Sequence, residues 1–253
     1  MKREDPFPYH IAIILDGNGR WARRRGLPRV LGHQAGIDSV REVVEECARI
    51  GVRSLTLYAF SLENWGRPKT EVRVLMRLLR RFLVEERPRL LENRVRLVAM
   101  GRIEDLPADV RKELARTESL TADLGGMVLR LALSYGGRRE IADAARRIAE
   151  AAVRGEVDPR AIDEETVSAH LYAPVLPDPD LLIRTAGEMR VSNFLLWQIS
   201  YTEFYVTPVC WPEFRSRHLH EAIEAFRGRE RRFGGLSARA ARGSAAIGSD
   251  GRS

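Results

Sequence analysis

Short apolar runs alternate with helical periodicities along most of the chain. Apolar or alternating runs predict β-strands at His10–Leu15, Val52–Phe60, Val95–Met100, Met127–Ser134, Leu181–Arg184 and Phe204–Val206. Apolar positions three and four residues apart predict helices at Gly36–Ile50, Glu71–Glu86, Ala108–Leu120, Arg138–Val153, Glu164–Leu171, Phe194–Gln198 and His218–Phe226. This alternation over short connections indicates an α/β fold, with a mostly parallel six-stranded sheet surrounded by helices.

A single domain accounts for this whole pattern, and short flanking segments lie outside it. Residues 10–235 carry all of the predicted strands and helices, without a linker or internal repeat. Residues 1–9 are charged and interrupted by proline, and we expect an N-terminal extension there. Residues 236–253 are small, polar and glycine-rich, which predicts a disordered tail.

No segment has the character of a membrane span or an export signal. No apolar run approaches the roughly 18 residues that span a bilayer. The first residues lack the apolar core of a signal peptide. Cys47 and Cys210 have no partner at metal-site spacing, so we expect reduced thiols packed in the core. The cytoplasm is the expected compartment.

The charge balance predicts an anionic partner. The formal net charge is +7, and the chain has 42 basic residues, of which only Lys2, Lys69 and Lys112 are lysine. Nucleic acid, phosphorylated small molecules and anionic membranes all fit this charge. The arginines are spread over many predicted helices and no nucleic-acid motif appears, which argues against a nucleic-acid-binding protein.

Polar segments follow three of the predicted strands. They run over residues 16–22, 61–68 and 184–193, and each carries glycine or arginine. In open α/β sheets, ligands bind outside the carboxyl ends of the strands. We therefore expect the three segments to converge on one edge of the sheet.

The segment from Asp16 to Arg20 has the parts of a diphosphate site. Its glycines let the backbone approach a ligand closely and adopt positive φ. Arg20 can hold phosphate oxygens in a bidentate fork, and Asp16 is a hard oxygen ligand for Mg²⁺. The sequence is equally good turn chemistry with a capping aspartate, so both interpretations stay open. It matches neither GxGxxG nor a P-loop.

A second anion site is indicated after the fifth strand. Arg184, Arg190 and Ser192 suit a second diphosphate, although solvated surface arginines are the ordinary alternative. Their place directly after a buried strand favours binding. A lone glutamate such as Glu203 is usually solvated or ion-paired, but its apolar and aromatic neighbours also fit a buried carboxylate with a specific partner.

The segment after the second strand supports two interpretations. Ser61 and Asn64 have the chemistry of helix caps. The glycine and proline that follow them also fit a mobile loop that closes over substrate. Tryptophans 21 and 65 are core residues by default, and His33 alone is more often structural than catalytic.

Together these segments resemble the cis-prenyltransferase family, typified by undecaprenyl diphosphate synthase. The matching stretches are HIAIILDGNGRWA (His10–Ala22), GHQAG (Gly32–Gly36), LYAFSLENWGRP (Leu57–Pro68), SYGGRREI (Ser134–Ile141) and IRTAGEMRVSNFLLWQISYTEFY (Ile183–Tyr205). They occur in the family's order and with similar spacing, and they cover the chain from about His10 to Phe233.

The resemblance implies a role for each matching residue. Asp16 corresponds to the family's essential aspartate, which binds Mg²⁺ at the allylic diphosphate. The allylic diphosphate cradle corresponds to Gly17, Asn18, Gly19, Arg20 and Arg29, with Trp21 and His33 beside it. The mobile segment at the reacting centre corresponds to Ser61, Leu62, Glu63, Asn64, Trp65 and Arg67. The isopentenyl diphosphate site corresponds to Arg184, Arg190, Val191 and Ser192, and Glu203 to a second Mg²⁺-associated carboxylate.

The resemblance also implies the reaction. It is Mg²⁺-dependent cis-condensation of isopentenyl diphosphate with geranyl or farnesyl diphosphate, carried out by residues 10–235 in a homodimer. Family accounts make Asn64 the proton acceptor, but an amide is a poor base, and a diphosphate oxygen is an equal candidate. Long products partition into lipid, which fits a loose peripheral association with membranes. The small Ala59 indicates room for a longer product, with Met127 deeper in the tunnel.

Three further comparisons bear on this resemblance. Some family members have His at the position of Met189, and a thioether is a poor ligand for a hard metal. A non-catalytic partner subunit is expected to have lost Asp16 or an arginine site, and this chain retains them. A trans-type prenyltransferase is disfavoured because DDxxD is absent and the pattern is α/β.

Overall fold

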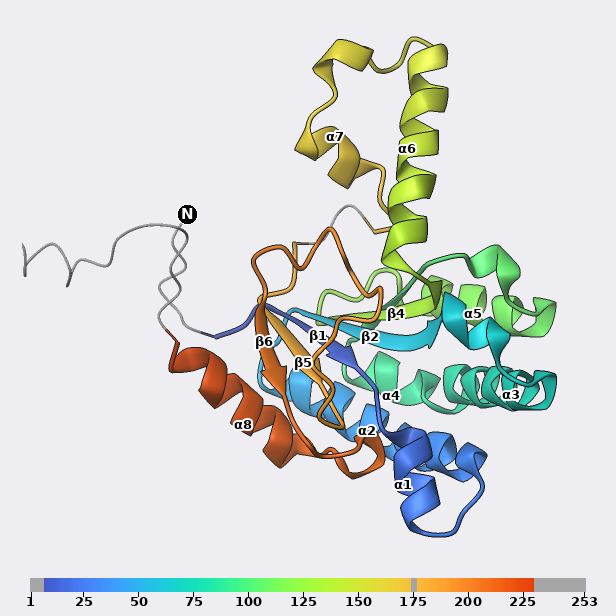
Figure 1. The fold of residues 1–253 in the computed structure, drawn as a ribbon, viewed down its shortest axis with the longest axis vertical. Coiled ribbons are helices and arrows are strands. Elements are labelled where there is room, and N and C mark those ends of the chain that lie inside the picture. Colours follow the sequence, from blue (N-terminus) through green and yellow to red (C-terminus); the bar gives the residue numbers. More distant parts are fainter. Residues whose placement is uncertain (1–6, 174–176, 230–253) are drawn as a thin grey trace, which may run out of the picture.

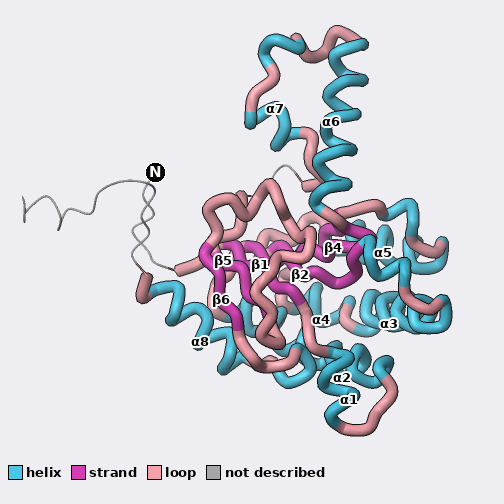
Figure 2. The backbone as a smooth tube through the Cα atoms, in the orientation of Figure 1, coloured by secondary structure: helices cyan, strands magenta, loops and turns pink. Residues whose placement is uncertain are grey.

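The computed structural model describes residues 7–173 and 177–229. Its centre is a sheet of six strands in the order β3-β4-β2-β1-β5-β6, and every neighbouring pair is parallel (Figure 2). The strands are β1 (His10–Ile14), β2 (Ser54–Ser61), β3 (Arg96–Met100), β4 (Val128–Tyr135), β5 (Leu181–Arg184) and β6 (Glu203–Val206). The predicted α/β class is confirmed, and the sheet is wholly rather than mostly parallel.

Helices connect and cover the strands. The α-helices are α1 (Asn18–Arg24), α2 (Arg29–Arg49), α3 (Lys69–Glu85), α4 (Arg87–Glu92), α5 (Ala108–Thr121), α6 (Gly137–Val153), α7 (Glu164–Ala169) and α8 (Ser216–Arg227). Short 3₁₀ helices are η1 (Leu62–Gly66), η2 (Ile103–Asp105), η3 (Pro159–Ala161) and η4 (Trp211–Glu213). Figure 1 shows α2, α4 and α8 below the sheet, while α6 and α7 form an arm that stands away from it.

Both faces of the central strands are buried, which explains their continuous apolar sequences. All five residues of β1 are buried. Alternate side chains of β2 serve different cores: Leu55 and Leu57 belong to the core against the lower helices, and Tyr58 belongs to the smaller core on the other face. Burial on two faces is typical of parallel sheets and removes the polar alternation of a half-exposed strand.

One helix begins two turns before its predicted first residue. The helix predicted to begin at Gly36 begins at Arg29: its first two turns pack on α1 through Gly32 and leave Leu31 exposed, so they lack the buried apolar stripe on which the prediction rested. The long helix ends at Glu85, one residue before its predicted end, and Pro88 follows in the first turn of the short helix α4, where its missing N–H costs nothing.

The predicted helix Phe194–Gln198 is wrong. The chain there makes consecutive turns, with positive φ at Asn193 (64°) and Leu195 (48°). Asn193 is held in this conformation because its side-chain oxygen accepts the N–H of Arg138 (2.9 Å) and its carbonyl accepts the N–H of Gly137 (2.7 Å). Phe194 is buried in the smaller core, so the apolar spacing reflects burial rather than a helix.

Parts of the predicted flanks lie outside the described residues. These are the tail over residues 236–253 and residues 1–6 of the N-terminal extension. Within residues 7–173 and 177–229, no helix is both long enough and apolar enough to cross a membrane.

Candidate active site

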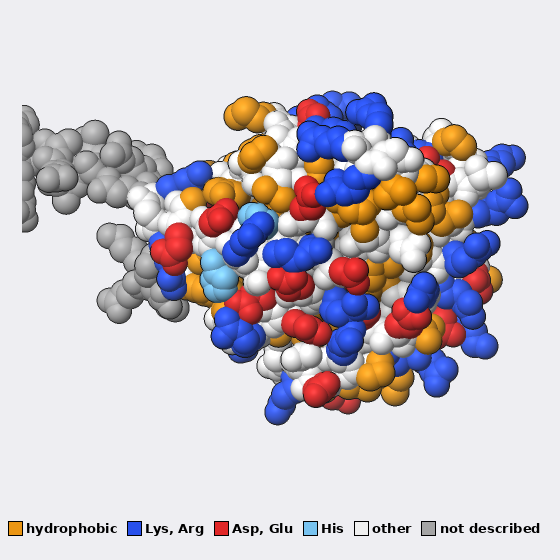
Figure 3. Space-filling view, turned by 90° about the horizontal axis from the view of Figure 1, so that it is seen from below, with side chains coloured by type: hydrophobic (Ala, Val, Ile, Leu, Met, Phe, Trp, Pro, Cys, Tyr) orange, Lys and Arg blue, Asp and Glu red, His pale blue; other side chains and the backbone are white. Residues whose placement is uncertain are grey.

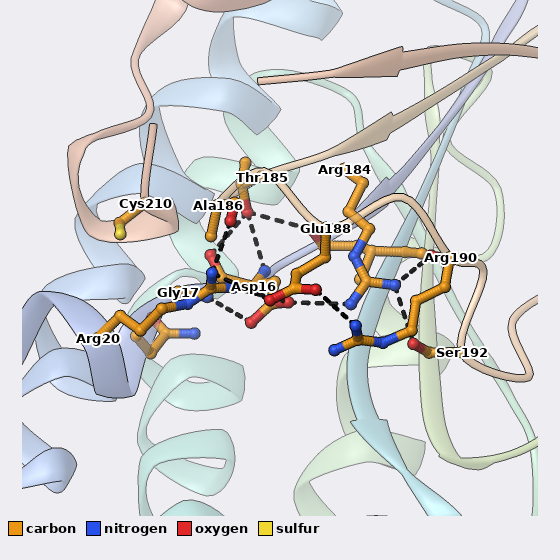
Figure 4. Close-up of polar contacts among 12 residues, drawn as sticks. Asp16, Gly17, Arg20, Arg184, Thr185, Ala186, Glu188, Arg190, Ser192 and Cys210 are labelled. Atoms are coloured by element: carbon orange, nitrogen blue, oxygen red, sulfur yellow. Dashed lines mark hydrogen bonds and ion pairs between the residues drawn. The ribbon is translucent and has the colours of Figure 1, made fainter. Parts of the chain in front are cut away.

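The three polar segments do meet at the carboxyl edge of the sheet. β1 and β5 are neighbours, with Ile14 paired to Arg184, so Asp16 comes to lie beside the loop that follows β5. Figure 4 shows this junction, where side chains from the two segments point toward one another. The third segment follows β2 as η1, on the other side of β1.

Asp16 is the centre of this junction. Its Oδ1 accepts the N–H of Gly17 (2.6 Å), and its Oδ2 accepts a hydrogen bond from Nη2 of Arg184 (2.9 Å). Nη2 of Arg20 lies 3.2 Å from the same Oδ2. Burial of the carboxyl group opposes ionisation, but the Arg184 and Gly17 hydrogen bonds and both arginine charges hold the pKa of Asp16 below its ordinary value. Asp16 is therefore an anion at neutral pH.

The turn after Asp16 requires glycine. Gly17 has φ of +100°, and a Cβ there would lie 2.8 Å from the Cβ of Ala186 and 2.9 Å from the Cα of Cys210. The positive φ expected for this segment is thus confirmed at Gly17, where neither conformation nor space allows a side chain.

Thr185 fixes the backbone of Asp16, and sequence reasoning missed it. The Thr185 hydroxyl accepts the N–H of Asp16 (2.9 Å) and lies 2.7 Å from the carbonyl oxygen of Asp16, to which it donates. Thr185 is fully buried. Its position directly after Arg184 could have indicated a role in the site, but a threonine at the end of a strand does not by itself predict one.

The loop after β5 is organised by Arg184. The Arg184 side chain is only 6% exposed, and its Nη1 donates to Oγ of Ser192 (2.8 Å) and to the carbonyl of Arg190. The Arg190 side chain is 62% exposed and pairs with Glu188. Glu188, which the sequence did not single out, also pairs with Arg20 (3.1 Å) and so bridges the two segments.

A cavity of about 200 Å³ opens beside Asp16 and lies between the sheet, α2 and α3. Its polar lining at the Asp16 end includes several predicted site residues: Asp16, Gly17, Asn18, Gly19, Arg29, His33, Asn64 and Arg67. The rest is mainly apolar and includes Ile37, Val40, Leu57, Ala59, Phe60, Leu75, Met76, Leu79, Phe82, Leu131 and Leu133. The cavity therefore suits a ligand with an anionic head and a hydrocarbon chain.

Glu71 lies among the basic residues of this polar end. Its Oε1 is 3.0 Å from Nη1 of Arg67, 3.4 Å from Nε of Arg29 and 3.8 Å from Nε2 of His33. Burial, with the charges of Arg67 and Arg29, lowers the pKa of His33 to about 4, so the imidazole is neutral at pH 7. The sequence pattern placed Glu71 only as the start of a helix; its spacing of four from Arg67 was the missed signal.

The segment after β2 forms η1 with a capping box. Ser61 is the N-cap, and its N–H donates to Oδ1 of Asn64 (3.3 Å), which confirms the capping interpretation. Trp65 packs edge-on against Phe60 and its Nε1 donates to Oγ of Ser134 (2.9 Å). Leu62 lies against Gly136, and Glu63 accepts a hydrogen bond from Asn193 (2.9 Å).

Besides Ser61, Leu62, Glu63 and Trp65 of the segment after β2, three predicted site residues lie outside the Asp16 junction and the cavity lining. Trp21 stacks under the guanidinium of Arg25 at 4.4 Å, and Val191 is partly buried against the smaller core. Glu203 is the first residue of β6, at the opposite edge of the sheet from Asp16, and it pairs with Arg229 (2.8 Å). Within one chain, the structure does not bring Glu203 to Asp16.

The residues at Asp16 fit one mode of Mg²⁺ binding. No group of three or more Asp, Glu, His or Cys side chains in residues 7–173 and 177–229 is arranged to hold a metal ion. A lone carboxylate is nevertheless sufficient where Mg²⁺ keeps several waters and takes its other ligands from substrate phosphates. Asp16 meets that requirement, because it is ionised and partly exposed beside the cavity.

Comparisons with known proteins cover almost the whole chain. The family described as "Putative undecaprenyl diphosphate synthase" matches residues 14–234. Isoprenyl transferase from Heliobacterium mobile is 53% identical over 90% of this chain and 88% of its own. Isoprenyl transferase from Geobacter sulfurreducens is 50% identical over 92% and 95% of the two chains.

Solved structures give the same result for the fold. Lavandulyl diphosphate synthase from Lavandula x intermedia, in complex with dimethylallyl diphosphate, matches with a TM-score of 0.89 and 39% identity, over 91% of this chain and 99% of the other. A probable undecaprenyl diphosphate synthase from Campylobacter jejuni matches with a TM-score of 0.75 and 34% identity, over 90% and 99%.

Proposed function

The chain belongs to the undecaprenyl diphosphate synthase family of prenyltransferases, and from this premise we propose that it condenses isopentenyl diphosphate with an allylic diphosphate, in cis and with Mg²⁺. The carrying observation is the 2.9 Å contact between Arg184 and Asp16. It joins the two arginine-bearing segments beside the apolar cavity, as a reaction between two diphosphate esters requires.

The allylic substrate is assigned to the cavity. Its hydrocarbon chain lies between α2, α3 and the sheet, and its diphosphate lies at Gly17–Gly19 with Arg29 and Arg67 beside it. Glu71 already holds both arginines, so an arriving diphosphate competes with this carboxylate for the same guanidinium groups. Diphosphate oxygens match the bidentate geometry of arginine.

Isopentenyl diphosphate is assigned to the loop after β5. Arg190 is exposed and Ser192 is fixed by Arg184, so both lie next to Asp16 rather than inside the apolar cavity. Asp16 is the residue that would hold Mg²⁺, which would neutralise charge that builds on the departing diphosphate. Arg20 adds positive charge at the same place.

Proton removal from the isopentenyl unit is assigned to a diphosphate oxygen. Asn64 lines the cavity, but its Oδ1 already accepts the N–H of Ser61 in the capping box, and an amide is a weak base. These contacts support a positioning role for Asn64 at the reacting carbons.

Product length follows from the cavity walls. A bulge in β2 between Tyr58 and Phe60 turns Ala59 toward the cavity, where its small side chain leaves room. Met127 is buried but does not line the cavity, so the expectation that it lies deeper in the tunnel is wrong. A cytoplasmic homodimer completes the proposal, as the family resemblance implies.

Incorporation of labelled isopentenyl diphosphate tests this function. The purified full chain is incubated with Mg²⁺ and, separately, with dimethylallyl, geranyl and farnesyl diphosphate; products are dephosphorylated and separated by length. We expect label in apolar products, lost with EDTA and in Asp16→Ala. Asp38→Ala is the matched control, because Asp38 is an exposed aspartate paired with Arg41 outside the site. No incorporation with any primer would refute the proposal.

A further inference from the structure

Helix α3 has two faces of opposite character. Its inner face supplies Leu75, Leu79 and Phe82 to the wall of the cavity. Its outer face carries Lys69, Arg73, Arg77 and Arg80, all exposed and spaced three or four residues apart. This spacing places the four cations in one stripe along the helix, because residues three and four apart are neighbours on a helical surface. We call these four residues the α3 stripe.

Most of the stripe lacks counter-charges. Lys69, Arg73 and Arg77 make no hydrogen bond or ion pair within the part of the chain that the structure describes. Arg80 has one partner, Asp109, at 3.6 Å. In Figure 3, which views the molecule from below, basic side chains gather along the right-hand rim, on the side where α3 lies in Figure 1. Three of the four cations in the stripe are therefore not neutralised by a side chain in the described part of the chain.

Aliphatic side chains accompany these cations. Val84 is one turn beyond Arg80 and 42% exposed, while Val74 and Leu78 are partly exposed beside the stripe. Leu78 also lines the cavity, so the apolar lining reaches the edge of the outer surface. A basic helix face interleaved with aliphatic residues is the composition of helices that lie on anionic bilayers.

We propose that the α3 stripe docks the enzyme on the surface of an anionic phospholipid bilayer. This inference rests on the proposed function for its purpose: a product with a diphosphate head and a long chain has to leave the cavity for a lipid phase, and α3 is the wall between them. Nucleic acid is the weaker candidate, because single strands bind through aromatic stacking, and the exposed side chains along the stripe are aliphatic.

The size of the effect follows from the charges. Each basic residue near an anionic membrane surface contributes roughly a five-fold gain in partitioning. Removing three of the four charges is therefore expected to weaken binding on the order of 100-fold. The attraction is screened by salt, so binding should fall steeply as ionic strength rises.

Sedimentation with vesicles tests the docking without any isoprenoid substrate. The full chain is mixed with vesicles of phosphatidylglycerol and phosphatidylcholine, or of phosphatidylcholine alone, at low salt. The stripe variant is Lys69→Gln, Arg73→Gln and Arg77→Gln together. The matched control is Arg53→Gln, Arg94→Gln and Arg96→Gln, three exposed arginines that also lack ion pairs among the described residues but lie at the start of β2 and β3.

The parent and the control should bind the anionic vesicles, and the stripe variant should bind roughly 100-fold more weakly. If both triple variants lost the same amount of vesicle binding, binding would depend only on the net charge of the protein, and the proposal would be overturned. Absence of parent binding, or stripe-dependent binding to duplex DNA without vesicle binding, would overturn it too. Condensation activity is measured separately on a soluble short primer in detergent, so failure of the proposed function is distinguishable from failure of docking.

Discussion

Replacing Thr185 by valine removes one hydroxyl group and changes the shape of the side chain very little. In the structure this hydroxyl accepts the N–H of Asp16 and donates to the carbonyl of Asp16. Valine can do neither, so the backbone beneath the aspartate loses its support from β5. We expect Thr185→Val to lower kcat while the protein stays folded.

The expected loss of stability in Thr185→Val depends on whether the backbone N–H and carbonyl of Asp16 keep other hydrogen-bond partners. The Asp16 N–H is also 2.9 Å from the carbonyl of Ile14, and the Asp16 carbonyl also accepts the N–H of Trp211 at 2.9 Å. Neither group is left wholly unpaired, so the free energy of unfolding should fall by only about 1 kcal/mol. Catalysis is more sensitive, because a shift of well under 1 Å in a catalytic group costs roughly ten-fold in rate.

The assay compares kcat and KM for isopentenyl diphosphate incorporation with urea unfolding of the same preparations. Thr185→Ser keeps the hydroxyl and should retain most of the activity. Thr202→Val is the matched control, since Thr202 is also buried and donates to the carbonyl of Pro179 (2.7 Å), but it lies before β6 at the other edge of the sheet. It should lose similar stability and keep the parent kcat.

Two results would refute this reasoning. If Thr202→Val lost as much kcat as Thr185→Val, the rate loss would follow general destabilisation. If Thr185→Ser were as slow as Thr185→Val, the hydroxyl group would not be the feature that matters.

Three further substitutions probe other parts of the fold. Ala59→Leu should shorten the products by filling the cavity wall, and an unchanged product ladder would contradict that placement. Gly32→Ala puts a Cβ 2.0 Å from the carbonyl oxygen of Asn18, so α1 must separate from α2; thermal denaturation should show a large loss of stability, and a melting temperature equal to that of the parent would contradict this contact. Burial lowers the pKa of His10 from 6.5 to about 3, so below pH 6.5 the unfolded chain binds a proton that the folded chain does not, and stability falls. Urea unfolding at about pH 7.5 and about pH 5 should therefore differ less for His10→Gln than for the parent, by roughly 2 kcal/mol, and an equal difference would reject His10 as the cause.

The positions of the central strands could be predicted from the sequence because strands that are buried on both faces consist of nearly continuous apolar residues. Residues 10–15 and 181–184 are short, apolar and followed by polar segments, and both proved to be central strands. The rule that ligands gather at the carboxyl edge then placed Asp16 beside Arg184, although the order of the strands was not predicted.

What the sequence could not show depends on contacts between distant elements. The turns at Asn193 and Leu195 adopt positive φ without glycine, because hydrogen bonds from α6 hold Asn193, and no local signal predicts this. Glu71 became part of the site only when the start of α3 met the start of α2. Glu203 has the carboxylate expected of a metal ligand, but it is the first residue of β6 and therefore lies at the end of the strand away from Asp16.

The pairing of β1 with β5 has a consequence for how the protein is made. The hydrogen bond between Arg184 and Asp16 joins residues 168 positions apart in the sequence. β1 therefore cannot pair with β5 during synthesis until nearly the whole domain has been made. Contacts of such long range slow folding, because a large loop must close before any of them forms. β1 is also the most apolar strand and lies in the middle of the sheet, so nascent chains that end before β5 expose one of its edges. Unfinished chains should therefore be the form of this protein that depends most on chaperones.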